Sequence, residues 1–390
     1  QPAADVLKAG EVELHVCAVG LNFRDVLNVL GEYPGDPGPP GGDCAGVVAA
    51  ATVMRLDYAA FGFAFGSLAS LARGVARLLV PLPRTLSFEQ ACSLPITWST
   101  THVAFAAAHC TTRHAVLVHA AAGGVGLAAA EYIAWLGAIT HGTAGQPHKH
   151  IALHADGDGV GASCTSSRVA SAFAVGLAHR VRSERLHVVL NSLSSDFTSA
   201  SFALLAERGC FEEIGKRGVW SLQLATAAAA SVNYDLLAVD VDMGAQSDWM
   251  QGVLRLLASR AGRDVIHGLP LVTFDFARAM QAAFRLLQKG QNVGKVVVRI
   301  AQPPPPGLPR EASTELLTGG TGGIGLLTAG WLAEAGRQSH VALVSRSGTL
   351  SAHDSERLRE CGAATVVVQR CDAAQPTETC ALSATMRRTL

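Results

Sequence analysis

Residues 115–145, AVLVHAAAGGVGLAAAEYIAWLGAITHGTAG, decide the fold of the chain. The short apolar run over Ala115–His119 predicts a strand, and the alanine-rich segment Val125–Leu136 predicts a helix. A second apolar run, which ends at Thr143, predicts another strand. A strand, a glycine-rich turn, a helix and a second strand in this order form a βαβ unit. The stretch therefore predicts an α/β protein with a parallel sheet.

The turn in this unit has the spacing that dinucleotide-binding proteins use. It reads Ala121-x-Gly123-x-x-Gly126, the G-x-G-x-x-G pattern with alanine in its first position. The second glycine lets the backbone approach a pyrophosphate, and the third lets the helix pack closely on the strand. The N-terminus of the helix adds free N–H groups and a partial positive charge. We therefore predict a nucleotide on Ala121, Gly123, Gly124, Val125 and Gly126; a purely steric glycine turn is the alternative.

The end of the second strand indicates which nucleotide binds. An NAD site carries Asp or Glu there to accept the ribose hydroxyls, and residues 143–150 contain neither. They contain Lys149, a cation that suits the extra phosphate of NADP. We predict NADPH as the cofactor, with Thr143 and Lys149 beside it. A solvated lysine at a helix start is the alternative for Lys149.

The composition limits the classes of function. Of the 390 residues, 49% are hydrophobic and 16% are charged, which fits two or three domains with buried parallel sheets. Lysine and arginine together number 31, as do aspartate and glutamate, so nucleic acid is not expected as a partner. No apolar run is long enough for a membrane helix, and no signal peptide opens the chain. We expect a cytoplasmic protein, with the plastid stroma open as a second location.

Metal sites and disulfides are not expected. The nine cysteines form no C-x-x-C pair, and the histidines show no metal-binding spacing. The chain begins at Gln1 without a methionine and ends at Leu390 in a polar stretch. We expect both ends to be cuts through a larger polypeptide.

The chain before the βαβ unit follows a different pattern. Glu11–Val19 and Cys44–Val53 read as strands, and glycine and proline interrupt the loop over Pro37–Gly42. This strand-rich pattern contains no βαβ unit, so it predicts a separate compact β domain beside the nucleotide domain.

A series of short motifs runs through most of the chain. In order they are GLNFRDVL at 20–27, YPG at 33–35, VPLP at 80–83, LP at 94–95 with Thr100 and Thr101, the glycine turn, NSL at 191–193, IGK at 214–216 and VGKVVV at 293–298. Together they resemble the enoyl reductase domain of multifunctional fatty acid and polyketide synthases. That domain belongs to the zinc-free branch of the medium-chain dehydrogenase/reductases.

The resemblance implies a GroES-like β domain followed by a doubly wound Rossmann domain. The β domain would occupy residues 1–105, with a return of the chain at 240–300, and the Rossmann domain would occupy residues 106–239. Between Val48 and Pro81 the family has a longer β segment, and the family's first β strand is also missing here. We therefore expect a shortened β domain.

The resemblance also implies roles in catalysis. Reduction of an α,β-unsaturated thioester needs a hydride at the β carbon and a proton at the α carbon of the resulting enolate. The residues that match the family's proton-donor pair are Lys216 and Asp240, and Tyr33 is a second candidate donor. A cation near the nicotinamide would also stabilise the enolate charge. A structural salt bridge is the alternative for the pair, and simple packing is the alternative for the tyrosine.

Further residues are assigned to the surroundings of NADPH by the same resemblance. Arg168 would hold the adenosine phosphate together with Lys149. The others would lie near the nicotinamide, the ribose or the back of the site, and they are Asn22, Thr101, Asn191, Ser192, Gly215, Gly294 and Lys295. A turn or cap role is the alternative for each.

The segment AQPPPPGLP marks the end of the first module. Its prolines cannot donate to a sheet or continue a helix, so it predicts a stiff linker over residues 301–312. A second strand, turn and helix follow, and the turn carries Gly320, Gly322 and Gly325. Arg346 ends the next strand, where a 2′-phosphate would sit.

Residues 313–390 resemble the start of a ketoreductase domain of the short-chain dehydrogenase family. The resemblance implies a truncated second Rossmann-like domain. Such reductases use a catalytic tyrosine, and the last tyrosine of this chain is Tyr234. We therefore expect this module to lack ketoreductase activity in the present chain.

These observations predict an NADPH-dependent enoyl reductase that acts on an acyl chain held by an acyl carrier protein. Other domains of the same synthase are further expected partners, and a homodimer is left open. Two alternatives remain at this point. One is a free-standing quinone reductase of the same branch, and the other is a degenerate structural module that binds nucleotide weakly or not at all.

Overall fold

The computed structural model describes residues 7–33, 35–36, 38–51, 58–155, 164–181, 185–194, 196–215, 218–301, 314–334, 340–360, 365–375, 378–379 and 382. The chain divides into two compact units, residues 1–302 and residues 303–390, which are described separately below. Within the described residues, no helix is both long enough and apolar enough to cross a membrane.

The first unit contains a mixed sheet that is largely antiparallel. Strand β1 alternates between fully and partly buried positions, as expected for a strand with one face in a core, and Val12, Leu14 and Val16 are buried in that core. The strands lie in the order β12-β13-β1-β2-β3-β5, and β4 pairs with β1. They are β1 (Glu11–Leu21), β2 (Asp43–Ala51), β3 (Ala59–Phe63), β4 (Leu71–Val75), β5 (Leu79–Pro81), β12 (Leu271–Asp275) and β13 (Lys295–Arg299).

This sheet is the GroES-like domain that the sequence predicted. Where the chain was expected to be shortened, the described residues still form β3, β4 and β5. Five helices and one short 3-10 helix accompany the sheet and its return. They are α1 (Phe23–Val29), η1 (Ala76–Leu78), α2 (Phe88–Ala91), α9 (Val239–Ala245), α10 (Ser247–Gly262) and α11 (Phe276–Gln288).

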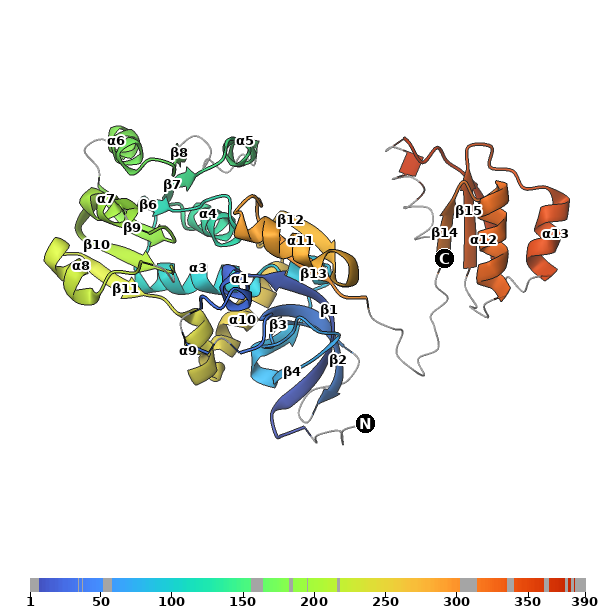
Figure 1. Cartoon of the computed structure of the whole chain (residues 1–390), viewed down its shortest axis with the longest axis horizontal. Helices are drawn as coiled ribbons and strands as arrows, with labels where there is room; N and C mark the ends of the chain where they lie inside the picture. Colours follow the sequence, from blue (N-terminus) through green and yellow to red (C-terminus); the bar gives the residue numbers. More distant parts are fainter. Residues whose placement is uncertain are drawn as a thin grey trace. The chain divides into compact units, whose positions relative to one another are not determined.

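The second sheet of this unit is parallel throughout. Its order is β11-β10-β9-β6-β7-β8, in which the first strand of the sheet along the chain, β6, lies in the middle and the chain winds outward in both directions. The predicted Rossmann fold is thus confirmed (Figure 1). The strands are β6 (Ala115–Val118), β7 (Ile139–Ala144), β8 (Cys164–Ser166), β9 (Leu186–Asn191), β10 (Leu205–Glu213) and β11 (Asn233–Leu236).

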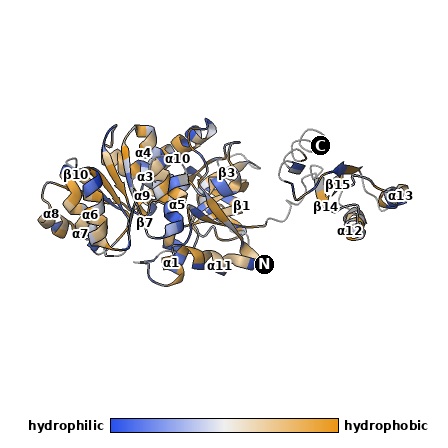
Figure 2. Ribbon diagram, turned by 90° about the horizontal axis from the view of Figure 1, so that it is seen from above, coloured by the Kyte–Doolittle hydropathy of each residue, from blue (hydrophilic) through white to orange (hydrophobic). Residues whose placement is uncertain are grey.

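Helices cover both faces of the parallel sheet, so its strands are apolar on both sides. Val116 and Val118 of β6 pack in one hydrophobic cluster with α3 and α4, whereas Ala115 and Leu117 pack in another with α6 and α7. Figure 2 accordingly shows these strands largely in the colour of hydrophobic residues. The helices are α3 (Pro95–Ala107), α4 (Gly124–Leu136), α5 (Pro147–Ala155), α6 (Ala170–Val181), α7 (Asp196–Leu204) and α8 (Leu222–Ala228).

The second unit contains a three-stranded parallel sheet in the order β14-β15-β16. Its strands are joined by helices, as in the opening of a Rossmann-like domain, which confirms the predicted fold of this region. The elements are β14 (Thr314–Thr318), α12 (Gly323–Glu334), β15 (His340–Ser345), α13 (Ala352–Glu360) and β16 (Thr365–Arg370).

Candidate functional site

A cavity of about 630 Å³ lies in the first unit, where the GroES-like sheet meets the carboxyl ends of the parallel strands. Leu190 at the end of β9 and His119, which follows β6, both line it. These two strands are neighbours at the point where the strand order reverses, which is where open α/β sheets bind ligands. Of the residues predicted from sequence, the cavity is lined by Asn22, Gly123, Gly124, Val125, Gly126, Lys149, Ser192, Gly215, Asp240, Gly294 and Lys295.

The glycine turn has the steric requirements that its sequence predicted. A Cβ atom at Gly126 would lie 2.5 Å from the carbonyl oxygen of Ala121, so only glycine lets α4 approach the strand this closely. Helix α4 begins at Gly124 without a side-chain cap, and its free N–H groups are therefore available to an anion. The turn also contacts the return strand, because the N–H of Gly294 donates to the carbonyl of Ala122 over 2.8 Å.

A series of buried hydrogen bonds holds the residues that lead into the turn. The N–H of Ala120 donates to the hydroxyl of Thr143 (3.2 Å), and that hydroxyl lies 3.1 Å from Nδ1 of His119. Nε2 of His119 then donates to Ser201 (2.8 Å), whose own hydroxyl donates to the carbonyl of Phe197. Burial lowers the pKa of His119 to about 3, so the ring is neutral. Thr143, predicted to lie beside the cofactor, is fully buried, and its hydroxyl takes part in this series of hydrogen bonds.

Two cations lie at the carboxyl ends of β7 and β8. Lys149, in the first turns of α5, lines the cavity and is half-buried. Desolvation lowers the pKa of its ammonium group, and no carboxylate within the described part of the chain forms an ion pair with it. Arg168 follows β8, and its Nε donates to the carbonyl of Gly145 at the end of β7. Both cations are therefore placed near the second strand, as an NADP site requires.

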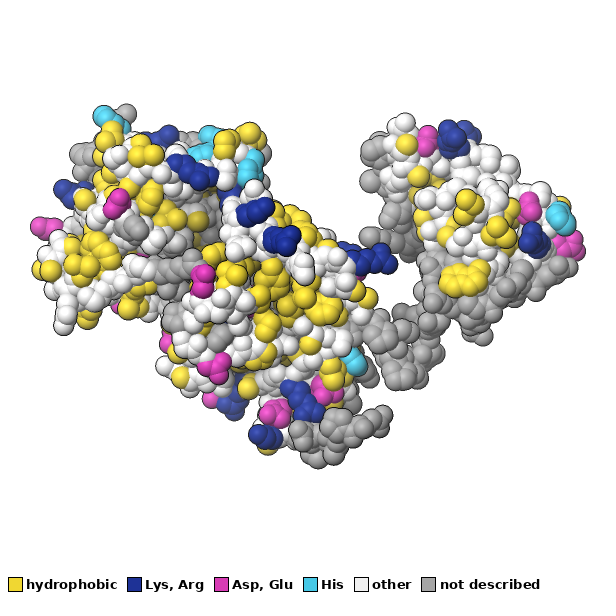
Figure 3. Space-filling model, viewed as in Figure 1, with side chains coloured by type: hydrophobic (Ala, Val, Ile, Leu, Met, Phe, Trp, Pro, Cys, Tyr) yellow, Lys and Arg dark blue, Asp and Glu magenta, His cyan; other side chains and the backbone are white. Residues whose placement is uncertain are grey.

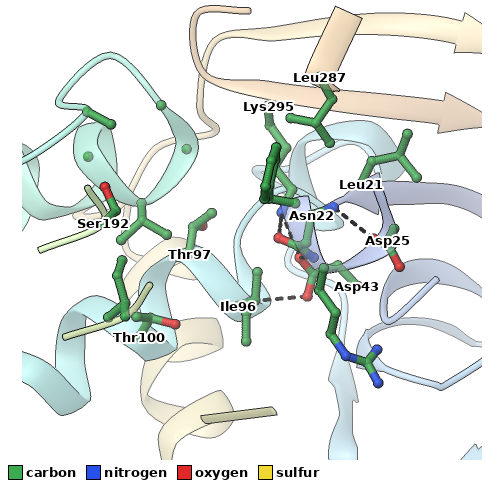
Figure 4. A pocket seen from close by; sticks show the side chains of 18 of the residues that line it. Leu21, Asn22, Asp25, Asp43, Ile96, Thr97, Thr100, Ser192, Leu287 and Lys295 are labelled. Atoms are coloured by element: carbon green, nitrogen blue, oxygen red, sulfur yellow. Dashed lines mark hydrogen bonds and ion pairs between the residues drawn. The ribbon is translucent and has the colours of Figure 1, made fainter. Parts of the chain in front are cut away.

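A buried polar network forms another part of the cavity wall (Figure 4). Nζ of Lys295 lies 2.6 Å from Oδ1 of Asn22 and 2.8 Å from Oδ2 of Asp43, and both charged side chains are at most 4% exposed. Nδ2 of Asn22 donates to the same carboxylate oxygen over 2.9 Å. The amide of Asn22 is thus held in one orientation by a buried ion pair. Charge-assisted hydrogen bonds of this kind are the stronger ones in proteins.

Local structure explains how these side chains come together. Asn22 is the N-cap of α1, and its own N–H donates to the carboxylate of Asp25 (2.8 Å) in a capping box. The stem of Lys295 passes between two glycines: a Cβ at Gly20 would lie 3.0 Å from its Cε, and one at Gly124 would lie 3.4 Å from its Cδ. Burial raises the pKa of Asp25, and the backbone N–H groups of Asn22 and Gly41 oppose that rise.

Asp240 lies at the cavity and is held by two residues of the GroES-like domain. The hydroxyl of Tyr33 donates to its Oδ2 over 2.7 Å, and Nε of Arg24 lies 3.4 Å from the same oxygen. The guanidinium of Arg24 also lies 5.1 Å from the centre of the Tyr33 ring. Burial and the hydrogen bond to Asp240 raise the pKa of Tyr33, so its phenol keeps its proton at neutral pH. Lys216, the predicted partner of Asp240, lies outside the described residues.

Three other predicted residues lie behind the cavity wall. Thr101 is fully buried, and its hydroxyl donates to the carbonyl of Thr97. Asn191 is also fully buried and donates to Glu213 over 2.6 Å. Ala121 is buried beneath the turn. Their contacts are structural, and a direct contact with a cofactor stays a prediction for each.

The sequence reasoning missed several residues that the fold brings to the cavity. Asp43 and Arg24 belong to the two networks described above, and Thr97, Thr100 and Phe65 line the cavity. Asp43 had a signal in the sequence, because it is the first residue of an otherwise apolar strand and a buried carboxylate needs a partner. Arg24 and Thr100 belong to the motifs quoted above, although neither was assigned to the site. Thr97 and Phe65 had no signal, because a threonine in an apolar helix or an aromatic residue in a loop usually packs without a further role.

In the second unit, the glycine turn is present and its surroundings are sparser. Gly320 and Gly325 lie where a Cβ would meet backbone atoms at 2.6 Å, and Gly322 donates its N–H to Gly319. Arg346 directly follows β15, at the place predicted for it. The 630 Å³ cavity is lined by residues of the first unit only. Across the described residues of both units, no group of three or more His, Cys, Asp or Glu side chains could hold a metal ion.

Comparison with known proteins agrees with this geometry. Residues 313–390 match the family described as KR domain, and residues 163–298 match the family described as zinc-binding dehydrogenase. The crystal structure of CurK enoyl reductase is similar, with a TM-score of 0.70 and 31% identity over 77% of this chain and 94% of that one. The chain belongs to the enoyl reductases of polyketide synthases. It thus combines an enoyl reductase-like domain of the zinc-free medium-chain dehydrogenase/reductases with a partial ketoreductase domain.

Two further proteins are similar to the chain, one in sequence and one in structure. The spectinabilin polyketide synthase system protein NorB of Streptomyces orinoci is 36% identical over 96% of this chain, and the chain spans 17% of that protein's length. The Escherichia coli quinone oxidoreductase, solved in complex with NADPH, has a TM-score of 0.65 at 22% identity over 76% of this chain and 94% of that one. That second likeness shows the fold alone.

Proposed function

We propose that the first unit is an NADPH-dependent enoyl reductase, which reduces the α,β double bond of a thioester carried by an acyl carrier protein during polyketide synthesis. The observation that carries the proposal is the composition of the 630 Å³ cavity. The glycine turn forms one wall, and Asp240 and the Lys295 network form others. Tyr33 adjoins the cavity through its hydrogen bond to Asp240. The predicted cofactor-binding turn and the predicted catalytic Asp240 therefore share one space.

The residues of the turn fit a dinucleotide. The free N–H groups at the uncapped start of α4 would bind the pyrophosphate. The close approach of Gly126 to Ala121 holds the helix start in the position where it can do so. The ammonium of Lys149, half-buried and without a carboxylate partner among the described residues, would hold the 2′-phosphate together with Arg168. Bound NADPH would supply the hydride that reduces the β carbon of the substrate.

The protein's own residues would orient the thioester and supply the proton. The buried pair of Lys295 and Asp43 fixes the amide of Asn22 before substrate arrives, which removes a reorganisation cost from the reaction. The hydroxyl of Tyr33 stays protonated and donates a hydrogen bond to Asp240 in the resting site. Lys216 and Tyr33 are the two candidate donors to the α carbon, and Asp240 would orient whichever of them acts.

Steady-state kinetics with a crotonyl thioester of N-acetylcysteamine test this function. We expect NADPH oxidation to yield one equivalent of the saturated thioester. Reduction of a quinone without any reduction of the enoyl thioester would assign the chain to the alternative quinone reductases. Absence of NADPH binding would instead indicate a structural module.

The roles of the two donors can be separated by substitution. Lys216→Ala should lower kcat at least tenfold and leave the Kd for NADPH within about twofold, because its role arises as enolate charge develops. Tyr33→Phe removes only the hydroxyl and is the matched comparison. If Lys216→Ala weakened NADPH binding and kept the turnover at saturation, the lysine would be a cofactor-binding residue.

A further inference from the structure

Helix α11 carries a stripe of cations that the proposed reaction does not use. Arg278, Arg285 and Lys289 are all exposed. Their spacing of seven and four residues places them on one face of a helix with about 3.6 residues per turn. At about 1.5 Å of rise per residue, the stripe is about 16 Å long. Dark blue side chains accordingly lie over α11 in Figure 3.

The stripe is a local excess of positive charge in a chain whose net charge is zero. Lysine plus arginine equals aspartate plus glutamate over the whole sequence, yet residues 276–301 contain no acidic residue. Within the described residues, none of the three cations forms an ion pair. Three aligned cations without partners repel one another, and an anionic surface would relieve that repulsion.

The opposite face of α11 connects the stripe to the cavity. Ala283, Phe284 and Leu287 pack against β13 and the end of β1 in a hydrophobic cluster. Leu287 and Gly290, at the C-terminal end of the helix, line the cavity itself. Figure 4 shows Leu287 at its wall. A molecule seated on the stripe would thus lie on a helix whose other face borders the proposed active site.

An apolar border accompanies the cations. Helix α1 packs beside α11, and Phe23, Val29 and Leu30, on or directly after α1, are 46%, 61% and 46% exposed. Exposed apolar side chains that adjoin a charged stripe are characteristic of protein docking surfaces. A small free substrate would need neither feature.

We propose that Arg278, Arg285 and Lys289 form the docking surface for the carrier protein, which would present an acidic surface to them. The inference rests on the proposed function, because it concerns delivery of the thioester to that same site. Neighbouring cations of the stripe are separated along the helix axis by about one Debye length at physiological salt, which is about 8 Å. They therefore act jointly on an approaching anionic surface. The surface would raise the encounter rate and orient the tethered thioester toward Leu287 and the cavity.

Kinetics on the full chain with two forms of one substrate test the docking surface. The crotonyl group is supplied either on a carrier protein or on N-acetylcysteamine. In the triple variant Arg278→Glu, Arg285→Glu and Lys289→Glu, KM for the carrier-bound form should rise at least tenfold. The kcat/KM for the N-acetylcysteamine thioester and the Kd for NADPH should stay within twofold. Added salt should raise KM for the carrier-bound form in the unaltered chain and have little effect in the variant.

A matched control variant makes the same change of charge elsewhere. Arg84, Arg255 and Arg263 are also exposed, and no residue of α10, which carries Arg255, lines the cavity. Their joint replacement by glutamate should leave KM for the carrier-bound form unchanged.

Several outcomes would overturn the proposed docking surface. One is an unchanged KM in the α11 variant, and another is an equal rise of KM in the control variant. A loss of NADPH affinity in the α11 variant would show that the stripe attracts the cofactor instead. If the unaltered chain reduces neither thioester, the proposed function itself fails, and this result is distinct from the other three.

Discussion

The glycine turns at residues 121–126 and 320–325 have nearly the same backbone. In the first turn, the N–H of Ala121 donates to the carbonyl of Thr143 on β7 over 2.8 Å. In the second turn, the N–H of Gly320 donates to the carbonyl of Val344 on β15 over 3.0 Å. A Cβ at the last glycine of either turn would meet backbone atoms at about the same distance, 2.5 Å at Gly126 and 2.6 Å at Gly325. By local geometry alone, the two turns are equivalent.

Their surroundings differ. The first turn lies between β6 and its neighbour β9, contacts Gly294 from the return strand, and lines a cavity together with Lys295. In the second unit, β14 is an end strand of the described sheet, and α12 leaves Ile324 and Trp331 82% and 61% exposed. Glycine spacing therefore specifies a turn, and a binding site additionally needs residues that distant parts of the chain supply.

The largest expected effect comes from placing a Cβ atom in each turn. Gly126→Ala should weaken NADPH binding at least 100-fold, about 2.7 kcal/mol, because the methyl group would force α4 away from the carbonyl of Ala121. Gly325→Ala makes the same change in the second turn and should leave that affinity unaltered. Fluorescence titration with NADPH measures both. Affinity within threefold of the unaltered chain in Gly126→Ala would show that the first turn does not hold the cofactor.

A second comparison concerns buried charge in the two parallel sheets. Both carboxylate oxygens of Glu212, on β10, are buried without a hydrogen-bond partner among the described residues, and burial followed by the charge of Asp235 raises its pKa to about 8. In the sheet of the second unit, β15 and β16 contain no acidic residue. Between pH 4.5 and about 8 the native state holds one proton more than the unfolded state, so the stability of the first unit falls as pH rises through this range.

Glu212→Gln cannot ionise and should remove that pH dependence. The variant should gain about 2 kcal/mol relative to the unaltered chain at pH 8 and little at pH 4.5; a full shift would correspond to about 5 kcal/mol, and relaxation together with the unpartnered amide reduces it. Glu207→Gln, an exposed position on the same strand, is the control. Chemical denaturation at a series of pH values provides the measurement. Equal pH dependence in all three proteins would refute the assignment.

A third prediction compares Lys149 with Arg346, the two cations that the sequence predicts beside a 2′-phosphate in the first and the second unit. Lys149→Ala should weaken NADPH binding about tenfold, which is about 1.4 kcal/mol, and should leave NADH binding unchanged. In the unaltered chain, NADPH should bind at least tenfold tighter than NADH. Arg346→Ala, the corresponding change in the second unit, should alter neither affinity of the first. Equal loss of NADPH and NADH affinity in Lys149→Ala would mean that the lysine contacts a group common to both nucleotides.

The smallest expected effect concerns the residue before each turn. Ala120 has φ = 51°, in the left-handed region, whereas glycine occupies the corresponding place at Gly319, with φ = 66°. A left-handed conformation costs alanine about 1 kcal/mol. Gly319→Ala should therefore destabilise the second unit and Ala120→Gly should stabilise the first, each by less than that amount, because glycine has more freedom than alanine in the unfolded chain. Thermal unfolding measures both changes, and destabilisation by Ala120→Gly would contradict the argument.

The sequence by itself determined the elements whose cause is local. The helix α4 begins one residue before its predicted start and ends at Leu136 as predicted, because apolar periodicity and glycine sterics act within a few residues. Both glycine turns follow from the same short-range cause, and the family motifs gave the order of the domains. Lys149 could be predicted as a phosphate-binding residue because a missing acid and a present cation are visible in eight consecutive residues, and the structure places it at the cavity.

Only the tertiary structure decided which of these residues share a space. Lys295 and Asp43 are 252 positions apart, and Tyr33 and Asp240 are 207 positions apart. No periodicity spans such distances, because contacts of this kind arise when β13 pairs with β1 and α9 packs beside the cavity. The fold also assigned Thr143 to the support of the turn, since a side chain at a strand end can face either the ligand or the core. The direction it takes depends on His119 from a neighbouring strand end, which the local sequence does not contain.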